Sequence, residues 1–78
     1  MHIKILGPGC KNCVLLYNLA IEAASDLGLD ASFEKIEDYA EIMSYGILST
    51  PGLVVDDVVV FSGKVPTKSH IKELLRNV

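Results

Sequence analysis

The chain has 78 residues, half of them hydrophobic, and its formal net charge is −3. A chain of this length predicts one small domain, residues 1–78, that buries only about 60% of its unfolded surface. The acidic balance excludes a typical nucleic-acid partner, because phosphate binding draws on clustered Lys and Arg. No segment approaches the ~18 apolar residues of a membrane span, and the first apolar run is too short for a secretion signal, so we expect a cytoplasmic protein with no membrane partner.

The first part of the chain predicts a strand, a helix and a strand. Apolar and polar residues alternate over residues 2–6, which is typical of a short strand. From Lys11 to Leu27 the apolar residues recur with a helical period, and Gly28 supplies the stop. Residues 31–36 predict a second strand, at the edge of a sheet because charged residues interrupt its apolar character.

Polar residues are predicted to cap the two remaining helices. Asp38 can cap a short helix that runs to about Tyr45, where Gly46 ends it. Thr67 can cap a last helix, which carries an apolar stripe.

Two β-branched runs between these helices predict a hairpin. They are Leu53–Val55 and Val58–Phe61, and Asp56-Asp57 separates them as a tight turn. The predicted order is β-α-β-α-β-β-α. It indicates an α/β fold with a mixed four-stranded sheet flanked by helices, in which the first two strands are parallel.

Both cysteines of the chain lie in the segment Gly7-Pro8-Gly9-Cys10-Lys11-Asn12-Cys13, where the first strand passes into the first helix. They could form a structural disulfide, part of a metal site or a redox-active pair. The structural disulfide is the weakest alternative, because cytoplasmic thiols are kept reduced and a crosslink closing so short a loop stabilises little.

The placement of the pair favours redox chemistry. Cys10 stands at the start of the helix, where unpaired N–H groups and the helix dipole stabilise a thiolate, and Lys11 can add to this field. Cys13 lies one turn further on and faces the apolar side, which shields its thiol. Residues three apart on a helix are also near enough to form a disulfide. We therefore interpret Cys10 as the attacking thiol and Cys13 as the resolving one.

A metal site is the alternative use of the same cysteines. His2 and His70 stand in no ligand spacing to the pair, which argues against a structural zinc site. A two-thiolate site for a soft metal or metalloid stays open, because thiolates select soft ions. On the redox interpretation no cofactor is needed.

A second motif adds a resemblance to a known family. The segment Tyr45-Gly46-Ile47-Leu48-Ser49-Thr50-Pro51-Gly52-Leu53 resembles the approach to the cis-proline of thioredoxins, and with the cysteine motif the likeness covers nearly the whole chain. Most closely, the chain resembles the small thioredoxin-like redox-active disulfide proteins. The segments that fit this group are Lys4-Ile5-Leu6-Gly7 before the cysteines, Ser49-Thr50-Pro51 in the middle and Gly63-Lys64-Val65-Pro66 before the last helix.

The resemblance implies a minimal thioredoxin-like fold and a thiol–disulfide oxidoreductase. It makes Cys10 the nucleophile, Cys13 the resolving thiol and Pro51 the cis-proline, with Thr50 offering backbone hydrogen bonds to a partner strand. Its partners would be protein disulfide substrates and a protein reductase.

The chain also departs from the family pattern. Gly9 replaces the tryptophan that precedes the first cysteine of thioredoxins, and Lys4 stands where their buried acid falls. Proton transfer to and from Cys13 must then use another group or water. The glycine–aspartate motif of glutaredoxins has no counterpart, so we do not expect glutathione to be a partner. Soft-metal carriage and a purely interacting domain remain the alternatives to the redox function.

Overall fold

The computed structural model describes residues 1–9 and 11–77, and within them it has three helices and one four-stranded sheet. The elements are β1 His2–Leu6, α1 Lys11–Asp26, β2 Ser32–Ile36, α2 Tyr39–Ser44, β3 Gly52–Val55, β4 Val58–Ser62 and α3 Lys68–Arg76. The predicted order of elements is confirmed, and the predicted bounds differ from the observed ones by about one residue.

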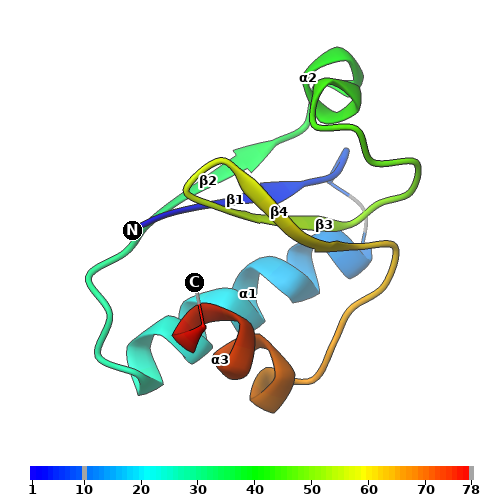
Figure 1. The fold of residues 1–78 in the computed structure, drawn as a ribbon. Coiled ribbons are helices and arrows are strands. Elements are labelled where there is room, and N and C mark those ends of the chain that lie inside the picture. The colour runs from blue at the N-terminus through cyan, green and yellow to red at the C-terminus, as the bar shows by residue number, and fades with distance from the viewer. Residues whose placement is uncertain (10, 78) are drawn as a thin grey trace.

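The sheet has the strand order β2-β1-β3-β4. β1 is parallel to β2 and antiparallel to β3, and β3 is antiparallel to β4, so the predicted mixed sheet is confirmed. β2 lies at an edge, as its charged residues indicated. Figure 1 shows α1 and α3 together on one face of the sheet and α2 alone on the other.

Two apolar clusters follow from this layering. β-Strand side chains alternate between the faces, so Ile3 and Ile5 point toward α1 and α3 whereas Leu6 points toward α2. The larger cluster includes Leu16 on α1 and Leu75 on α3. The smaller cluster consists of Leu6, Ile36, Ile42, Ile47 and Val54.

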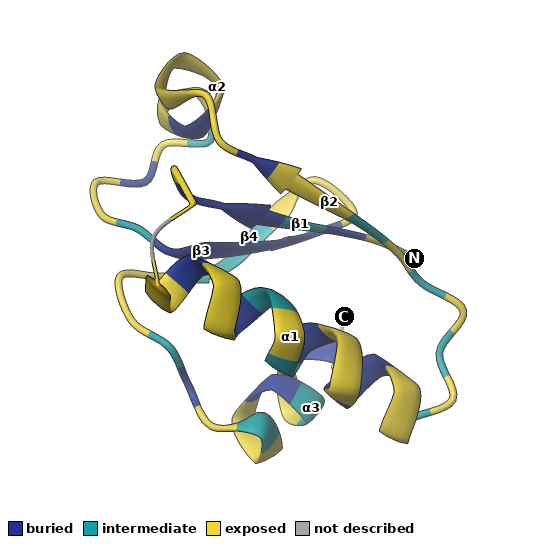
Figure 2. Cartoon of the chain, turned by 180° about the vertical axis from the view of Figure 1, so that it is seen from behind, coloured by how far each residue is buried: buried dark blue, intermediate teal, exposed yellow. Residues whose placement is uncertain are grey.

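Helix α1 has one buried side and one exposed side, which Figure 2 shows along its length. Its buried residues are Cys13, Leu16, Ala20, Ala23 and Ala24. At its C-terminal end, Asp26 forms ion pairs with α3, at 3.2 Å to Lys68 Nζ and 3.5 Å to Lys72 Nζ. Apolar packing and these surface pairs therefore join α1 to α3.

The predicted caps and turn are confirmed. The Asp38 side chain accepts a hydrogen bond from Glu41 N at 3.1 Å, and Thr67 Oγ1 accepts one from His70 N at 3.2 Å. Asp56 and Asp57 form the β3–β4 turn with positive φ angles of 48° and 68°. Aspartate is among the few residues that tolerate this conformation, because its short polar side chain can bond locally.

Across residues 1–9 and 11–77, no helix has the length and apolar character needed to span a membrane.

Candidate functional site

The turn from β1 into α1 is held against the end of β2. Gly7 N donates a hydrogen bond to Ile36 O at 2.9 Å, which continues the β1–β2 pairing one residue past β1. Gly9 then adopts a φ of +84°, where glycine carries no steric penalty. Cys10 lies outside the described residues, so its role as nucleophile stays a prediction.

Cys13 lies on the buried side of α1, with only 5% of its surface exposed. The backbone of Gly7 passes directly over it: a Cβ added at Gly7 would collide with Cys13 Sγ and would lie 3.1 Å from Cys13 Cβ. The same added atom would lie 3.9 Å from Thr50 Cβ. Gly7 is therefore the point where the cysteine segment and the Thr50 segment meet, and only a residue without a side chain fits there.

The Thr50–Pro51 peptide bond is cis, and Pro51 is fully buried. Pro51 O accepts a hydrogen bond from Gly63 N at 2.9 Å, which ties this loop to the end of β4. Ser49 Oγ lies 2.8 Å from where a Cβ of Gly63 would be, so a side chain at position 63 would displace the Ser49 hydroxyl, and Gly63 also has a positive φ of 98°.

A pocket of about 140 Å³ opens beside Cys13. Besides Cys13, its lining residues are Ile5, Gly7, Gly9, Val14, Lys35 and Glu37. Lys35 Nζ lies 4.5 Å from the centre of the Tyr17 ring, a cation–π contact that holds its charge at the rim. The pocket therefore brings a buried cysteine, an ammonium group and a carboxylate to one place.

A second hollow, of about 260 Å³, lies between α2 and the loop that leads to Pro51. Its apolar lining includes Met43 and Leu48, which are 68% and 100% exposed, and Thr50 also lines it. Thr50 thus lines this hollow and also lies close to Gly7, whose backbone covers Cys13. Its role in positioning a partner stays a prediction.

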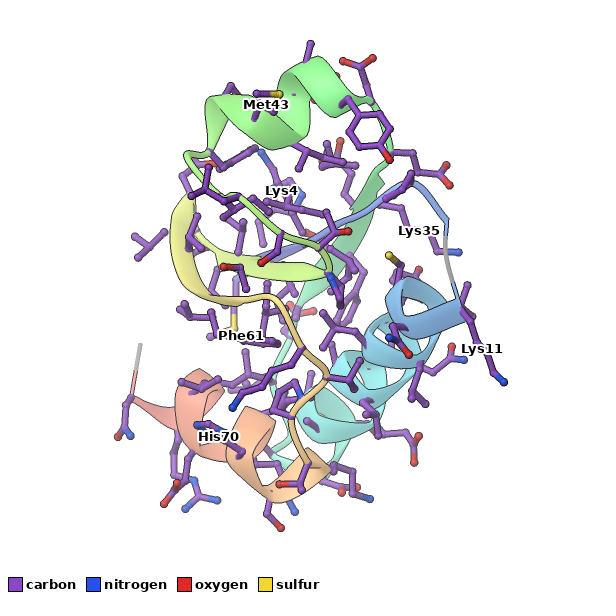
Figure 3. The ribbon with its side chains drawn as sticks, turned by 90° about the vertical axis from the view of Figure 1, so that its right-hand side faces the viewer. Lys4, Lys11, Lys35, Met43, Phe61 and His70 are labelled. Atoms are coloured by element: carbon purple, nitrogen blue, oxygen red, sulfur yellow. The ribbon has the colours of Figure 1, made fainter. Side chains whose placement is uncertain are left out.

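Lys4 is not part of the Cys13 pocket. Its side chain lies on the α2 face of the sheet (Figure 3), where Nζ donates to Tyr45 Oη at 2.8 Å and to Asp57 Oδ1 at 3.3 Å. The hydrogen bond to Tyr45, and secondly that to Asp57, raise the pKa of Lys4 above its ordinary value. The lysine that stands at the family's acid position therefore belongs to a polar network rather than to the site.

Lys11 is exposed at the start of α1, and its support of a thiolate stays a prediction. His2 Nε2 lies 3.2 Å from Glu34 Oε1, and His70 is exposed in the first turn of α3. Within the described part of the chain, no three His, Cys, Asp or Glu side chains converge as a metal site would need.

Glu37 is a residue of this region that the sequence interpretation did not single out. A signal for Glu37 was present, because it directly follows β2 and the carboxyl ends of neighbouring parallel strands meet at one edge of a sheet. Gly63 belongs to a segment that resembles the family, but its contacts with Ser49 and Pro51 were not predicted, because they arise only from the folded arrangement of the loops.

Comparison with known proteins agrees with this architecture. The family model described as the thioredoxin domain matches residues 1–76. A thioredoxin of Methanothermobacter thermautotrophicus is 44% identical over 75 residues, which cover 96% of this chain and 97% of the relative. A thioredoxin of Methanocaldococcus jannaschii is 41% identical over 75 residues, covering 96% and 86%. The chain belongs to the thioredoxin family, and its fold is a minimal thioredoxin-like fold.

Proposed function

We propose that this protein catalyses reversible thiol–disulfide exchange with protein partners through Cys10 and Cys13. Thiol–disulfide oxidoreductase activity is supported at the level of the family. The assignment to these two cysteines, and to protein substrates and a protein reductase in particular, is our proposal.

The reaction has two steps. The Cys10 thiolate attacks one sulfur of a partner disulfide, forming a mixed disulfide and releasing the other partner sulfur as a thiolate. Cys13, as a thiolate, then attacks Cys10 Sγ; the Cys10–Cys13 disulfide forms and the second partner sulfur leaves with the electron pair. The partner gains two electrons and the protein loses two. A protein reductase would return the pair to the dithiol, and no cofactor takes part.

The observation that carries this proposal is the meeting of the two sequence motifs at Gly7. Cys13 and Thr50 belong to segments far apart in the chain, and both lie within 3.9 Å of the position that a Cβ of Gly7 would take. A loop packed beside a cysteine pair can hold a partner strand while its disulfide is attacked. We assign that role to Thr50, with Pro51 as the buried support of the loop.

The hollow beside Thr50 suggests how a partner is seated. A partner strand that pairs with the backbone at Thr50 would lay a neighbouring side chain toward Met43 and Leu48, whose exposed apolar surface would then be covered. We therefore expect partner disulfides flanked by apolar residues to react faster than those flanked by acidic ones.

Reduction of insulin disulfides by dithiothreitol tests the function. The wild-type chain should accelerate the reaction, Cys10→Ser should abolish the acceleration, and Cys13→Ser should accumulate mixed disulfides with the substrate. In the reduced protein, iodoacetamide should label Cys10 before Cys13. Retention of activity by Cys10→Ser, or prior labelling of Cys13, would contradict the assigned roles.

The rival function is soft-metal or metalloid carriage by the same cysteines. A Cu(I) titration in competition with a chelator, run on the same preparation, separates the two. Tight Cu(I) binding without any insulin reduction would favour the carrier. We place the protein in the cytoplasm, where reductants can return Cys10 and Cys13 to the dithiol that the cycle needs.

A further inference from the structure

The pocket beside Cys13 contains a carboxylate that the two-step reaction above does not use. Among the described residues that line it, Glu37 is the only acid. The charged residues that line the pocket, Lys35 and Glu37, come from the end of β2, whereas Lys11 at the start of Cys13's own helix is exposed and does not line it. The Thr50 segment, on the other side, contributes a neutral residue.

The backbone register sets the position of Glu37. Leu6 pairs with Ile36 and Gly7 N bonds Ile36 O, so Glu37 comes directly after the β2 residue that holds the turn above Cys13. Glu37 Oε2 lies 2.8 Å from where a Cβ of Gly9 would be. A side chain at position 9 would thus displace the carboxylate, and Gly9 lets it approach the turn between β1 and α1.

Cys13 needs a proton acceptor when it resolves a mixed disulfide. Its burial disfavours the charged thiolate, so the neutral thiol must give up its proton as it attacks. Lysine ammonium groups are protonated near pH 7 and cannot accept one. Glu37 is exposed to solvent on one side and lines the Cys13 pocket on the other, and the pocket of about 140 Å³ is large enough for a water molecule to carry the proton between them.

We propose that Glu37 is the proton acceptor for Cys13. In the resolving step the proton of the Cys13 thiol passes to the Glu37 carboxylate, directly or through water in the pocket. The thiolate then forms the bond to Cys10 Sγ, and the partner sulfur leaves with its electrons. When the disulfide is reduced, the Glu37 carboxylic acid returns the proton to Cys13. This inference rests on the proposed function. It assigns to Glu37 the proton transfer to and from Cys13, which Lys4, at the family's acid position, does not provide.

Whether Glu37→Gln speeds or slows the resolving step separates a proton acceptor from a carboxylate that acts only through its charge. A negative charge that only lies near Cys13 would oppose its thiolate, so Glu37→Gln would speed the resolving step. A proton acceptor predicts the opposite result. We expect Glu37→Gln to slow resolution by roughly tenfold near pH 7, below the usual range for general base catalysis because water can partly substitute.

Stopped-flow reaction of the reduced protein with dithionitrobenzoate measures the step directly. The first thionitrobenzoate released reports attack on the reagent, and the second reports displacement by the resolving thiol. Cys13→Ser should give only the first release, which assigns the phases. In Glu37→Gln the first phase should keep its rate and the second should slow.

Two further variants control for charge and folding. Glu41→Gln removes one exposed carboxylate from α2, which lies outside the Cys13 pocket, and should leave both phases unchanged. Glu37→Asp keeps an acceptor on a shorter side chain and should restore part of the lost rate. An unchanged or faster second phase in Glu37→Gln would overturn the proposal for Glu37. Absence of a second release from the wild-type protein would instead overturn the proposed function.

Discussion

The two faces of the sheet are built differently. On one face, α1 and α3 cover a continuous apolar cluster, and the charged contacts between them lie at the surface around Asp26. On the other face, the short helix α2 covers a smaller cluster. Beside this cluster, the Lys4 side chain donates hydrogen bonds to Tyr45 and Asp57. The candidate site lies at the end of the sheet where Gly7 and Thr50 meet. One face supplies most of the apolar packing, and the other uses a polar network where its helix is too short.

The largest expected effect is a difference in core packing between the faces. Leu16→Ala on α1 should lower the free energy of unfolding by about 4 kcal/mol, because the fully buried site cannot readily collapse. Ile42→Ala on α2 should cost nearer 2 kcal/mol, because the neighbouring Tyr39 and Met43 are exposed and free to move. Urea unfolding of both variants measures the difference. Equal losses would show that the faces are packed alike.

Gly7→Ala tests the close packing between the cysteine segment and the Thr50 segment. The added methyl group collides with Cys13 Sγ, so we expect a loss of about 2 kcal/mol from overpacking and a perturbed cysteine pair. Gly28→Ala is the control, because its added methyl meets nothing within 4 Å and its cost, about 1 kcal/mol, comes from the positive φ alone. The reduced and oxidised forms of each variant should be compared by urea unfolding. A Gly7→Ala protein whose two redox forms match the wild type would contradict the packing described here.

Lys4 should support the α2 face up to alkaline pH. Its folded pKa is raised above the ordinary value of 10.5, chiefly by the Tyr45 hydrogen bond, so its stabilisation is fully present below pH 10.5 and is lost as the pH rises through the folded value. Lys4→Met keeps most of the apolar stem but removes the charge. The difference in unfolding free energy between wild type and Lys4→Met should therefore be constant from neutral pH and should shrink only at the alkaline end. A difference that does not change there would mean that the network contributes nothing.

Asp26 should support the opposite face at neutral pH and lose this effect at the acidic end of the pH scale, and the effect should be smaller than that of Lys4. Its pKa is lowered below the ordinary value of 3.8, first by the hydrogen bond from Lys68 and then by the charge of Lys68. The stabilisation is thus present above pH 3.8 and is lost as the pH falls through the folded value. Thermal unfolding of Asp26→Asn should show a small deficit at neutral pH that fades in acid and in high salt, because the pair is exposed. A salt-independent deficit would point to another cause.

The sequence predicted the features that depend on local patterns of residues. The helical period of α1, the charged edge strand β2 and the caps Asp38 and Thr67 can each be seen within a few neighbouring residues, and the structure has all of them. The polar network was not predicted, because Lys4 and Tyr45 are 41 residues apart and only the fold brings them together. Asp57, interpreted as a turn residue alone, proves to be a partner of Lys4 as well.

The candidate site was predictable in its motifs but not in its contacts. The cysteine spacing and the segment before Pro51 pointed to both halves of the site, yet their meeting over Gly7 depends on the close approach of two backbones. Glu37 was missed because its signal, a position directly after β2, gains meaning only once β2 is paired in parallel with β1. Its relevance comes from the pocket that it shares with Cys13.

The most direct test of the central claim is the redox behaviour of the cysteine pair. The protein should be equilibrated in dithiothreitol buffers of graded potential, quenched with iodoacetamide and weighed by mass spectrometry. We expect a single two-electron transition between a doubly alkylated dithiol and an unalkylated monomer lacking two hydrogens, with Cys10→Ser and Cys13→Ser each unable to make that transition. Oxidation only to intermolecular dimers, or no oxidation at all, would contradict the proposed Cys10–Cys13 cycle.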